Sequence, residues 1–290
     1  GASCMGFSWP AVVISLVIIV VAASQLDLEK LSRAALEIDP IFLVAALLLW
    51  GVLLICKIWK WMEVVSVLGG KISPKESLIA LMVGLFVGVL TPGRIGDFVR
   101  AAYLKKQLSW GKGIMAVVLD RAMDVLTLMG FSVIAIFLLS REVGLVFISV
   151  EWSVALLIVA LLGLYFVLSK RFMKRVVWPI VQKLIPSSFR DMLVNLGKDF
   201  YESVPLLKQK FPSVIGAFLL GVIAWIFTIT MGWMLMRGIG LSLPWDVALL
   251  TIPIISLIEI IPVSVIGIGT RELASIAVLG IFGVSPEQAL

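Results

Sequence analysis

The stretch TPGRIGDFVR, residues 91–100, decides the fold because it places a chain turn and three charges between two apolar segments. Pro92 lacks an N–H and ends a preceding helix, while Gly93 and Gly96 permit a tight turn. The apolar run before it, residues 77–90, is 14 residues long. At 1.5 Å per residue such a helix spans about 21 Å, whereas the hydrocarbon core of a bilayer is about 30 Å thick. The sequence therefore predicts a chain that turns back inside a membrane.

The composition is that of a protein whose solvent is lipid. Of 290 residues, 61% are hydrophobic and 14% are charged, and the mean hydropathy is +1.14. Soluble domains are typically about 45–50% apolar and about 25% charged. In hydrocarbon every backbone polar group must be satisfied internally, so we expect an all-α, polytopic membrane protein. The absence of histidine removes imidazole metal ligands and Ser-His catalysis, and we expect no metal and no cofactor.

Loop charge points to the same turn. Residues 57–76 carry four lysines against two glutamates, and residues 94–112 carry five basic residues against one aspartate. Both stretches are expected on the cytoplasmic side, because positive charge accumulates in cytoplasmic loops. Two consecutive cytoplasmic loops cannot flank a single crossing. The simplest explanation is a re-entrant helical hairpin over residues 77–106.

A second pair of short apolar runs, residues 247–261 and 272–282, flanks a turn that again holds proline, glycine and arginine. We expect a second re-entrant hairpin over residues 247–283, entering from the opposite side. The order is then two helices, hairpin and helix in residues 7–140, followed by two helices and hairpin in residues 141–290. This order predicts an inverted repeat whose two hairpins meet near the membrane midplane.

The ends of the chain are interpreted from the same order. Residues 1–6 are taken as a cloning remnant and a short N-terminal segment, outside the fold. The first helix is expected to start on the cytoplasmic side of the cell membrane, so that the N-terminus is cytoplasmic. The second repeat lacks its final helix, and the pattern therefore predicts one more helix after Leu290.

The segment 170–210 joins two helices of the second repeat and is strongly basic. It holds nine Lys or Arg residues against three acids, so its net charge of +6 equals that of the whole chain. We expect a cytoplasmic loop that touches anionic lipid, since basic clusters beside membrane helices bind the negatively charged leaflet. A nucleic-acid-binding arm is the less favoured interpretation, and we expect no nucleic-acid partner.

Nine ionisable residues fall at apparent membrane depth. Each charge left alone at the bilayer centre costs about 2.5–3.5 kcal/mol on insertion scales. A chain keeps such residues only where they pair, reach water or meet a ligand. They are Arg94, Asp97, Arg100, Asp120, Arg121, Asp124, Glu259, Arg271 and Glu272.

These residues form three clusters. The rising helix that begins at Asp97 points its N-terminal amides into the membrane, where they suit a lipid phosphate. Asp120 and Asp124 lie one turn apart on one helix face and repel each other unless an arginine of another cluster lies near. In the third cluster Glu272 falls in the first turn of a helix, where the dipole favours an acid. The same residues could instead form dry ion pairs that only fasten the two hairpins together.

Three ordered motifs resemble a known family. They are TPGRIGD at residues 91–97, Asp120-Arg121-x-x-Asp124, and the run from Ile261-Pro262 to Arg271-Glu272. Together they resemble the lysylphosphatidylglycerol synthase transmembrane family, whose flippase-like domain forms the membrane half of the bacterial multiple peptide resistance factor. The resemblance covers nearly the whole chain and implies a lipid-handling membrane domain with inverted repeats.

The resemblance also implies a substrate cleft. No segment here resembles the soluble aminoacyl-transfer domain of the bacterial synthase, so we expect translocation rather than lipid synthesis. Some relatives carry the label polyprenyl-phosphate glucose synthase, but no nucleotide-sugar site is recognisable. Residues 262–267 hold fewer glycines than is usual in the family. Arg100, Asp120 and Glu259 are added to this cleft because they are ionisable residues at apparent membrane depth. The residues that the motif match places in the cleft are Pro92, Arg94, Gly96, Asp97, Arg121, Asp124, Pro262, Gly267, Gly269, Arg271 and Glu272.

The leading hypothesis is a lipid flippase or scramblase rather than an enzyme. The head group of a phospholipid or polyprenyl-linked lipid would pass through the cleft while its tails stay in the bilayer. Arg94, Arg100 and Arg271 would bind phosphate, and the aspartates would bind a cationic moiety or take up a proton. Two alternatives stay open. The first is a membrane glycosyl- or phospho-transferase that acts on a polyprenyl phosphate, with Asp120 or Asp124 as the base. The second is a secondary transporter of a small anion. An oligomer is compatible with each of these hypotheses.

Overall fold

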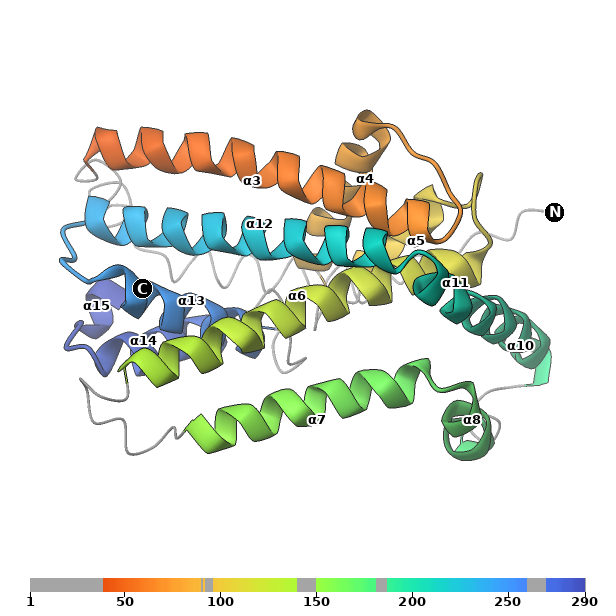
Figure 1. Cartoon of the computed structure of the whole chain (residues 1–290). Helices are drawn as coiled ribbons and strands as arrows, with labels where there is room; N and C mark the ends of the chain where they lie inside the picture. The colour runs from red at the N-terminus through yellow and green to blue at the C-terminus, as the bar shows by residue number, and fades with distance from the viewer. Residues whose placement is uncertain are drawn as a thin grey trace.

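The computed structural model describes residues 39–89, 91, 96–139, 150–180, 187–259 and 270–289. These residues form helices and no strand, which confirms the all-α class (Figure 1). The expected first helix, most of the first turn and the whole second turn lie outside the described residues.

Within the described part of the chain, three long helices are apolar enough to cross a membrane. Helices α3 and α12 have 28 residues each and α6 has 30, so each is about 42–45 Å long. A fourth crossing is available if Val154–Leu168 and Lys170–Ile180, which meet at a bend of 69°, form one broken span. The chain is therefore a multi-pass membrane protein. The helices are α3 (Pro40–Val67), α6 (Trp110–Leu139), α7 (Val150–Leu168) and α12 (Phe211–Gly238).

Helices α3 and α12 lie antiparallel along their whole lengths (Figure 1). At one end the N–H of Asp39 donates to the carbonyl oxygen of Gly238, at 3.1 Å. At the other end Nζ of Lys210 donates to the carbonyl oxygen of Ser66, at 2.6 Å. The carboxylate of Asp39 also caps α3 by accepting from the N–H of Ile41, at 2.9 Å. This helix pair forms one wall of the site described below.

The first predicted hairpin is present as two packed arms. Helix α4 (Pro74–Val89) precedes the turn and the short α5 (Val99–Tyr103) follows it. A Cβ atom on Gly96 would lie 2.3 Å from the carbonyl oxygen of Val87, so only glycine lets the two arms approach this closely. The hydroxyl of Thr91 accepts the N–H of Gly96, at 2.7 Å, and fixes the turn.

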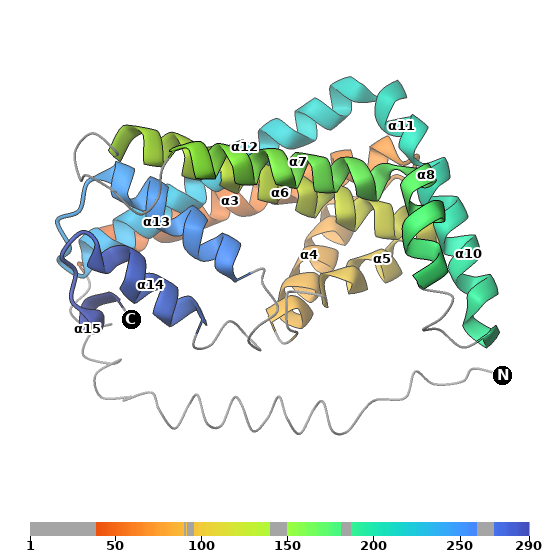
Figure 2. The same cartoon turned by 90° about the horizontal axis from the view of Figure 1, so that it is seen from below.

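The second predicted hairpin corresponds to α13 (Trp245–Ile258) and α14 (Thr270–Gly280), which pack against each other and precede α15 (Pro286–Ala289). Both hairpins lie on one side of the layer of long helices (Figure 2). The C-terminal ends of α4 and α13 point toward the middle of the molecule in both views (Figures 1 and 2). The inverted-repeat relation between residues 7–140 and 141–290, and the depth of the hairpins in a membrane, stay predictions.

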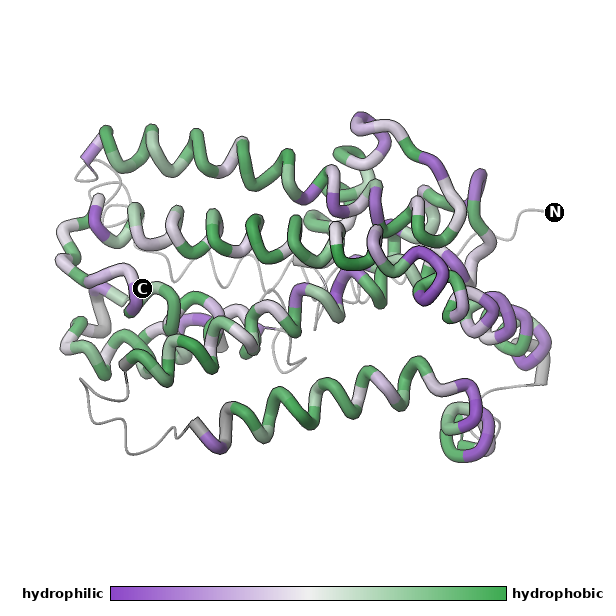
Figure 3. The backbone as a smooth tube through the Cα atoms, viewed as in Figure 1, coloured by the Kyte–Doolittle hydropathy of each residue, from purple (hydrophilic) through white to green (hydrophobic). Residues whose placement is uncertain are grey.

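The basic segment 170–210 is largely helical rather than an open loop. Its α8, α10 and α11 gather at the end of the molecule where α12 begins, and hydrophilic residues concentrate there (Figure 3). Helix α10 packs against α6, where a Cβ on Gly111 would lie 2.4 Å from the carbonyl oxygen of Leu196. The elements are α8 (Lys170–Phe172), the π-helical turn η2 (Met173–Val177), α10 (Ser187–Glu202) and α11 (Val204–Gln209).

Candidate functional site

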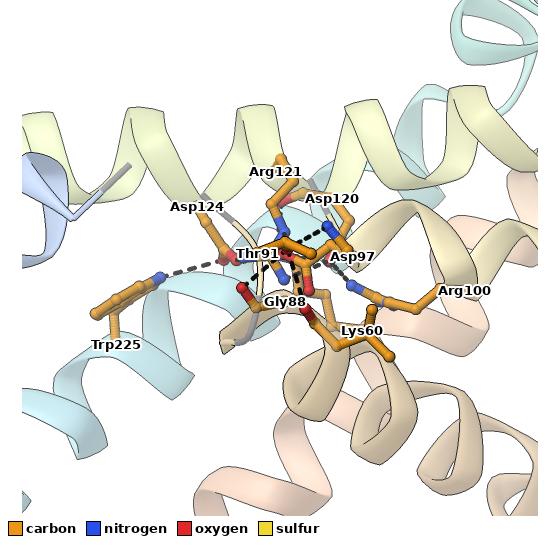
Figure 4. A network of polar contacts seen from close by, with 11 residues as sticks. Lys60, Gly88, Thr91, Asp97, Arg100, Asp120, Arg121, Asp124 and Trp225 are labelled. Atoms are coloured by element: carbon orange, nitrogen blue, oxygen red, sulfur yellow. Dashed lines mark hydrogen bonds and ion pairs between the residues drawn. The ribbon is translucent and has the colours of Figure 1, made fainter. Parts of the chain in front are cut away.

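Lys60 of α3 lies at the centre of a buried charge cluster. Its Nζ lies 2.9 Å from Oδ1 of Asp120 and 2.7 Å from Oδ1 of Asp124, both on α6 (Figure 4). It also donates to the backbone oxygen of Asp120, at 3.1 Å. The side chain of Lys60 is only 3% exposed. A single lysine therefore relieves the repulsion between two carboxylates one helical turn apart.

Arg100 of α5 approaches the same carboxylates from the hairpin. Its Nη1 donates to Oδ2 of Asp120 at 2.7 Å, and its guanidinium carbon lies 3.6 Å from the ring centroid of Trp61. The side chain is 1% exposed, yet its Nε and Nη2 have no hydrogen-bond partner among the described residues. A Cβ on Gly84 would lie 2.5 Å from Cδ of Arg100, so the glycine provides room for this side chain.

Arg121 is the outermost member of the cluster, with 37% of its side chain exposed. Its Nε lies 3.2 Å from Oδ2 of Asp97, an ion pair whose angle does not make a hydrogen bond. Longer contacts of 3.7 Å and 3.9 Å join it to Asp120 and Asp124. Asp124 also accepts from Nε1 of Trp225, at 3.1 Å. The first hairpin, α3, α6 and α12 thus all contribute to one polar centre.

A cavity of about 240 Å³ adjoins this centre and extends along α3. The α3 residues that line it are Trp50, Leu53, Leu54, Lys57 and Lys60, which recur every three to four positions and so share one face. From Trp50 to Lys60 this face runs about 15 Å. It is charged at one end and apolar at the other, and Trp50 is about half exposed.

The other apolar walls come from α4 and α12. Leu81, Met82 and Leu85 line the cavity from α4, and Trp225 and Met231 line it from α12. Leu85 is about half exposed, so the apolar end of the cavity reaches the molecular surface at α4. The cavity therefore joins a charged interior to an exposed apolar surface.

Lys57, unlike Lys60, has no carboxylate within ion-pair distance among the described residues. It lines the cavity, and its Nζ lies 5.6 Å from the ring centroid of Trp225. Within the described part of the chain it makes neither a hydrogen bond nor an ion pair. The described lining holds four cations and three carboxylates, an excess of one positive charge.

The third sequence cluster is not brought to this cavity. Nε of Arg271 lies 3.4 Å from Oε1 of Glu259, and the Arg271 side chain is 65% exposed. Glu272 falls in the first turn of α14, as expected, and is likewise absent from the lining. Among the described residues no group of three or more acids or cysteines is placed to hold a metal ion. The predicted site residues Pro92, Arg94, Pro262, Gly267 and Gly269 lie outside the described residues.

Comparison with known proteins identifies the family of the chain. A sequence model described as the lysylphosphatidylglycerol synthase TM region matches residues 8–290. The chain belongs to this family. The chain is similar to the UPF0104 membrane protein MJ1595 of Methanocaldococcus jannaschii. The two are 23% identical over 292 residues, which cover 96% of this chain and 85% of the relative. No solved structure matches the chain.

In this member of the lysylphosphatidylglycerol synthase TM family, the acids of the polar centre are apparent from the sequence but their main partner is not. Lys57 and Lys60 fall in a basic stretch over residues 57–76 that predicts a cytoplasmic loop, whereas α3 extends to Val67 and makes both residues helical. The signal that could have identified them is their spacing from Trp50, which places all three on one face of an apolar helix.

Proposed function

We propose that this protein moves a lipid between the two leaflets of the cell membrane, as a flippase or scramblase. The observation that carries the proposal is the two-ended cavity, whose charged end holds the ion-pair cluster and whose apolar end opens beside Trp50 and Leu85. A lipid has the same two-ended chemistry. The family supports a lipid-related role, and a soluble substrate would gain nothing from the apolar end.

The physical cost of flipping is the transfer of a charged head group from water into hydrocarbon. In this cavity the head group would exchange its hydration for side chains that are already held in place by other contacts. Lys60 and Arg100 are fixed by Asp120, so little further ordering accompanies binding. The acyl chains would stay among Leu81, Leu85 and the surrounding lipid.

We also propose an orientation. The end of the molecule formed by α8, α10 and α11 would face the cytoplasm, because eight of the nine basic residues of segment 170–210 lie in its described residues. Contact of this segment with anionic lipid follows from the same charge. The N-terminus would then be cytoplasmic, and residues 7–140 and 141–290 would form the two inverted repeats with one hairpin each.

Reconstitution tests the proposal directly. Purified protein in liposomes with a fluorescent phospholipid should speed transbilayer movement at least about ten-fold over protein-free liposomes, measured by quenching the outer leaflet. Leu85→Trp fills the apolar end of the cavity and should abolish most of this gain. Phe86→Trp is the matched control, because Phe86 is the adjacent, exposed residue and does not line the cavity.

The proposal is wrong if wild-type protein moves the lipid no faster than empty liposomes do. It is also wrong if Leu85→Trp and Phe86→Trp transport equally fast in proteins that both fold, as shown by size-exclusion chromatography.

A further inference from the structure

The geometry points to a cavity that selects its lipid by charge. It binds a phosphodiester lipid whose head group carries one net negative charge. This inference rests on the proposed function and names its substrate class. It excludes lipids whose head groups are zwitterionic or carry excess positive charge.

Each of the three described carboxylates of the cavity is already paired with a cation. Asp120 accepts from both Lys60 and Arg100, at 2.9 Å and 2.7 Å. Asp124 is paired with Lys60 at 2.7 Å. A cationic head group would have to displace one of these buried partners, and displacing one leaves an uncompensated charge.

Asp97 does not change this conclusion. Its Oδ2 lies 3.2 Å from Nε of Arg121, and Gly88 packs against its Oδ1, since a Cβ there would lie 2.8 Å away. This carboxylate is therefore enclosed by the hairpin and ion-paired with an arginine, although its Oδ2 accepts no hydrogen bond within the described residues. An ammonium group would have to compete with Arg121 for that oxygen.

The basic side does have unused capacity. Nε and Nη2 of Arg100 are buried, lack any hydrogen-bond partner among the described residues, and form the side-on fork with which arginine binds phosphate. Lys57 lines the same cavity beside the ring of Trp225, and within the described residues its Nζ makes no ion pair or hydrogen bond. A phosphodiester contributes two acceptor oxygens that match these donors.

Charge balance leads to the same class. The described lining contains the cations Lys57, Lys60, Arg100 and Arg121 and three aspartates, so one positive charge is left over. An uncompensated charge at membrane depth is unfavourable, and a ligand with one net negative charge removes it. A zwitterionic head group removes none of this charge, and its ammonium group would have to compete with cations that already pair with the described carboxylates.

Equilibrium binding of lipids to the purified chain in detergent, followed by native mass spectrometry, tests the inference. The probes are phosphatidylglycerol, phosphatidylcholine and lysylphosphatidylglycerol, with net charges of about −1, 0 and +1. We expect phosphatidylglycerol to bind about ten-fold more tightly than phosphatidylcholine, and lysylphosphatidylglycerol to bind most weakly. Inorganic phosphate in millimolar excess should not displace phosphatidylglycerol, and displacement would show a small-anion site and overturn the lipid assignment.

Variants of Lys57 sharpen the test. Lys57→Gln should reduce the preference for phosphatidylglycerol to about three-fold or less without weakening phosphatidylcholine, whereas Lys57→Arg should keep it. Lys75→Gln is the matched control, because Lys75 is exposed at the start of α4 and outside the cavity. An unchanged preference in a folded Lys57→Gln protein, or equal binding of the three lipids to wild type, overturns the inference.

The two proposals fail separately. Equal binding of all three lipids together with transport that Leu85→Trp blocks would remove the charge selection and leave the flippase intact. Charge-selective binding without transport in liposomes would retain the site and remove the flippase.

Discussion

The two hairpins use their charged residues in opposite ways. Arg100, which follows the first turn, is 1% exposed and reaches Asp120 on a long neighbouring helix. Arg271, which follows the second turn, has a side chain that is 65% exposed. It pairs with Glu259, which directly follows α13 in the same hairpin. Two hairpins of similar sequence pattern therefore need not contribute equally to a site. A charged residue of a hairpin joins the polar centre only where a neighbouring helix carries a residue of opposite charge.

Removing Lys60 should have the largest effect. Lys60→Met leaves Asp120 and Asp124 one turn apart without their shared cation, and breaking a buried pair in this way costs about 3–5 kcal/mol. The measurement is unfolding of the purified protein in detergent by heat or denaturant. Adding Asp124→Asn to Lys60→Met should recover part of the loss, because one of the two uncompensated charges is removed. Wild-type stability in Lys60→Met would mean that the cluster is hydrated rather than buried.

A smaller effect is expected where the first hairpin packs on Arg100. Gly84→Ala places a Cβ 2.5 Å from Cδ of Arg100, which Asp120 and Trp61 hold in position. We expect a stability loss of about 1–3 kcal/mol, as is usual for overpacking, and slower lipid transport. Gly280→Ala is the counterpart in the second hairpin, where a Cβ meets nothing within 4 Å. It should be neutral or slightly stabilising, and equal losses in both variants would contradict the difference between the hairpins.

The smallest effect should follow from breaking the pair in the second hairpin. Arg271→Gln removes a largely exposed partner of Glu259, and exposed pairs contribute about 1 kcal/mol or less. Unfolding in detergent and affinity for phosphatidylglycerol should both stay close to wild type, because Arg271 does not line the cavity. A loss as large as that of Lys60→Met would show that the second hairpin is coupled to the polar centre.

The sequence predicted those features that depend on local chemistry. A short apolar run before TPGRIGD indicated the first hairpin, and α4 and α5 confirm its two packed arms. Composition indicated an all-α membrane protein, and the long apolar helices confirm it. The i, i+4 spacing of Asp120 and Asp124 indicated that a cation must lie near both.

The sequence could not identify that cation, because the answer depends on which helices lie side by side. Arginines were expected, and Arg100 and Arg121 do contact the acids, but Lys60 contacts both carboxylates most closely. It is 60 residues from Asp120, and its charge was assigned to a cytoplasmic stretch over residues 57–76 although it belongs to α3. Spacing along one helix places Trp50, Lys57 and Lys60 on one face but carries no information on the partner helix, so the cavity was not predictable either.

The pairing of Lys60 with Asp120 and Asp124 also constrains how the chain is made. Helix α3 carries Lys57 and Lys60, and α6 carries two acids and an arginine, all in apolar surroundings. Each such charge costs about 2.5–3.5 kcal/mol in a helix that enters lipid alone. Ribosomal synthesis delivers α3 before α6, so its lysines lack their acidic partners until α6 emerges. Biogenesis of the protein is therefore expected to depend on delayed release of α3 into the bilayer.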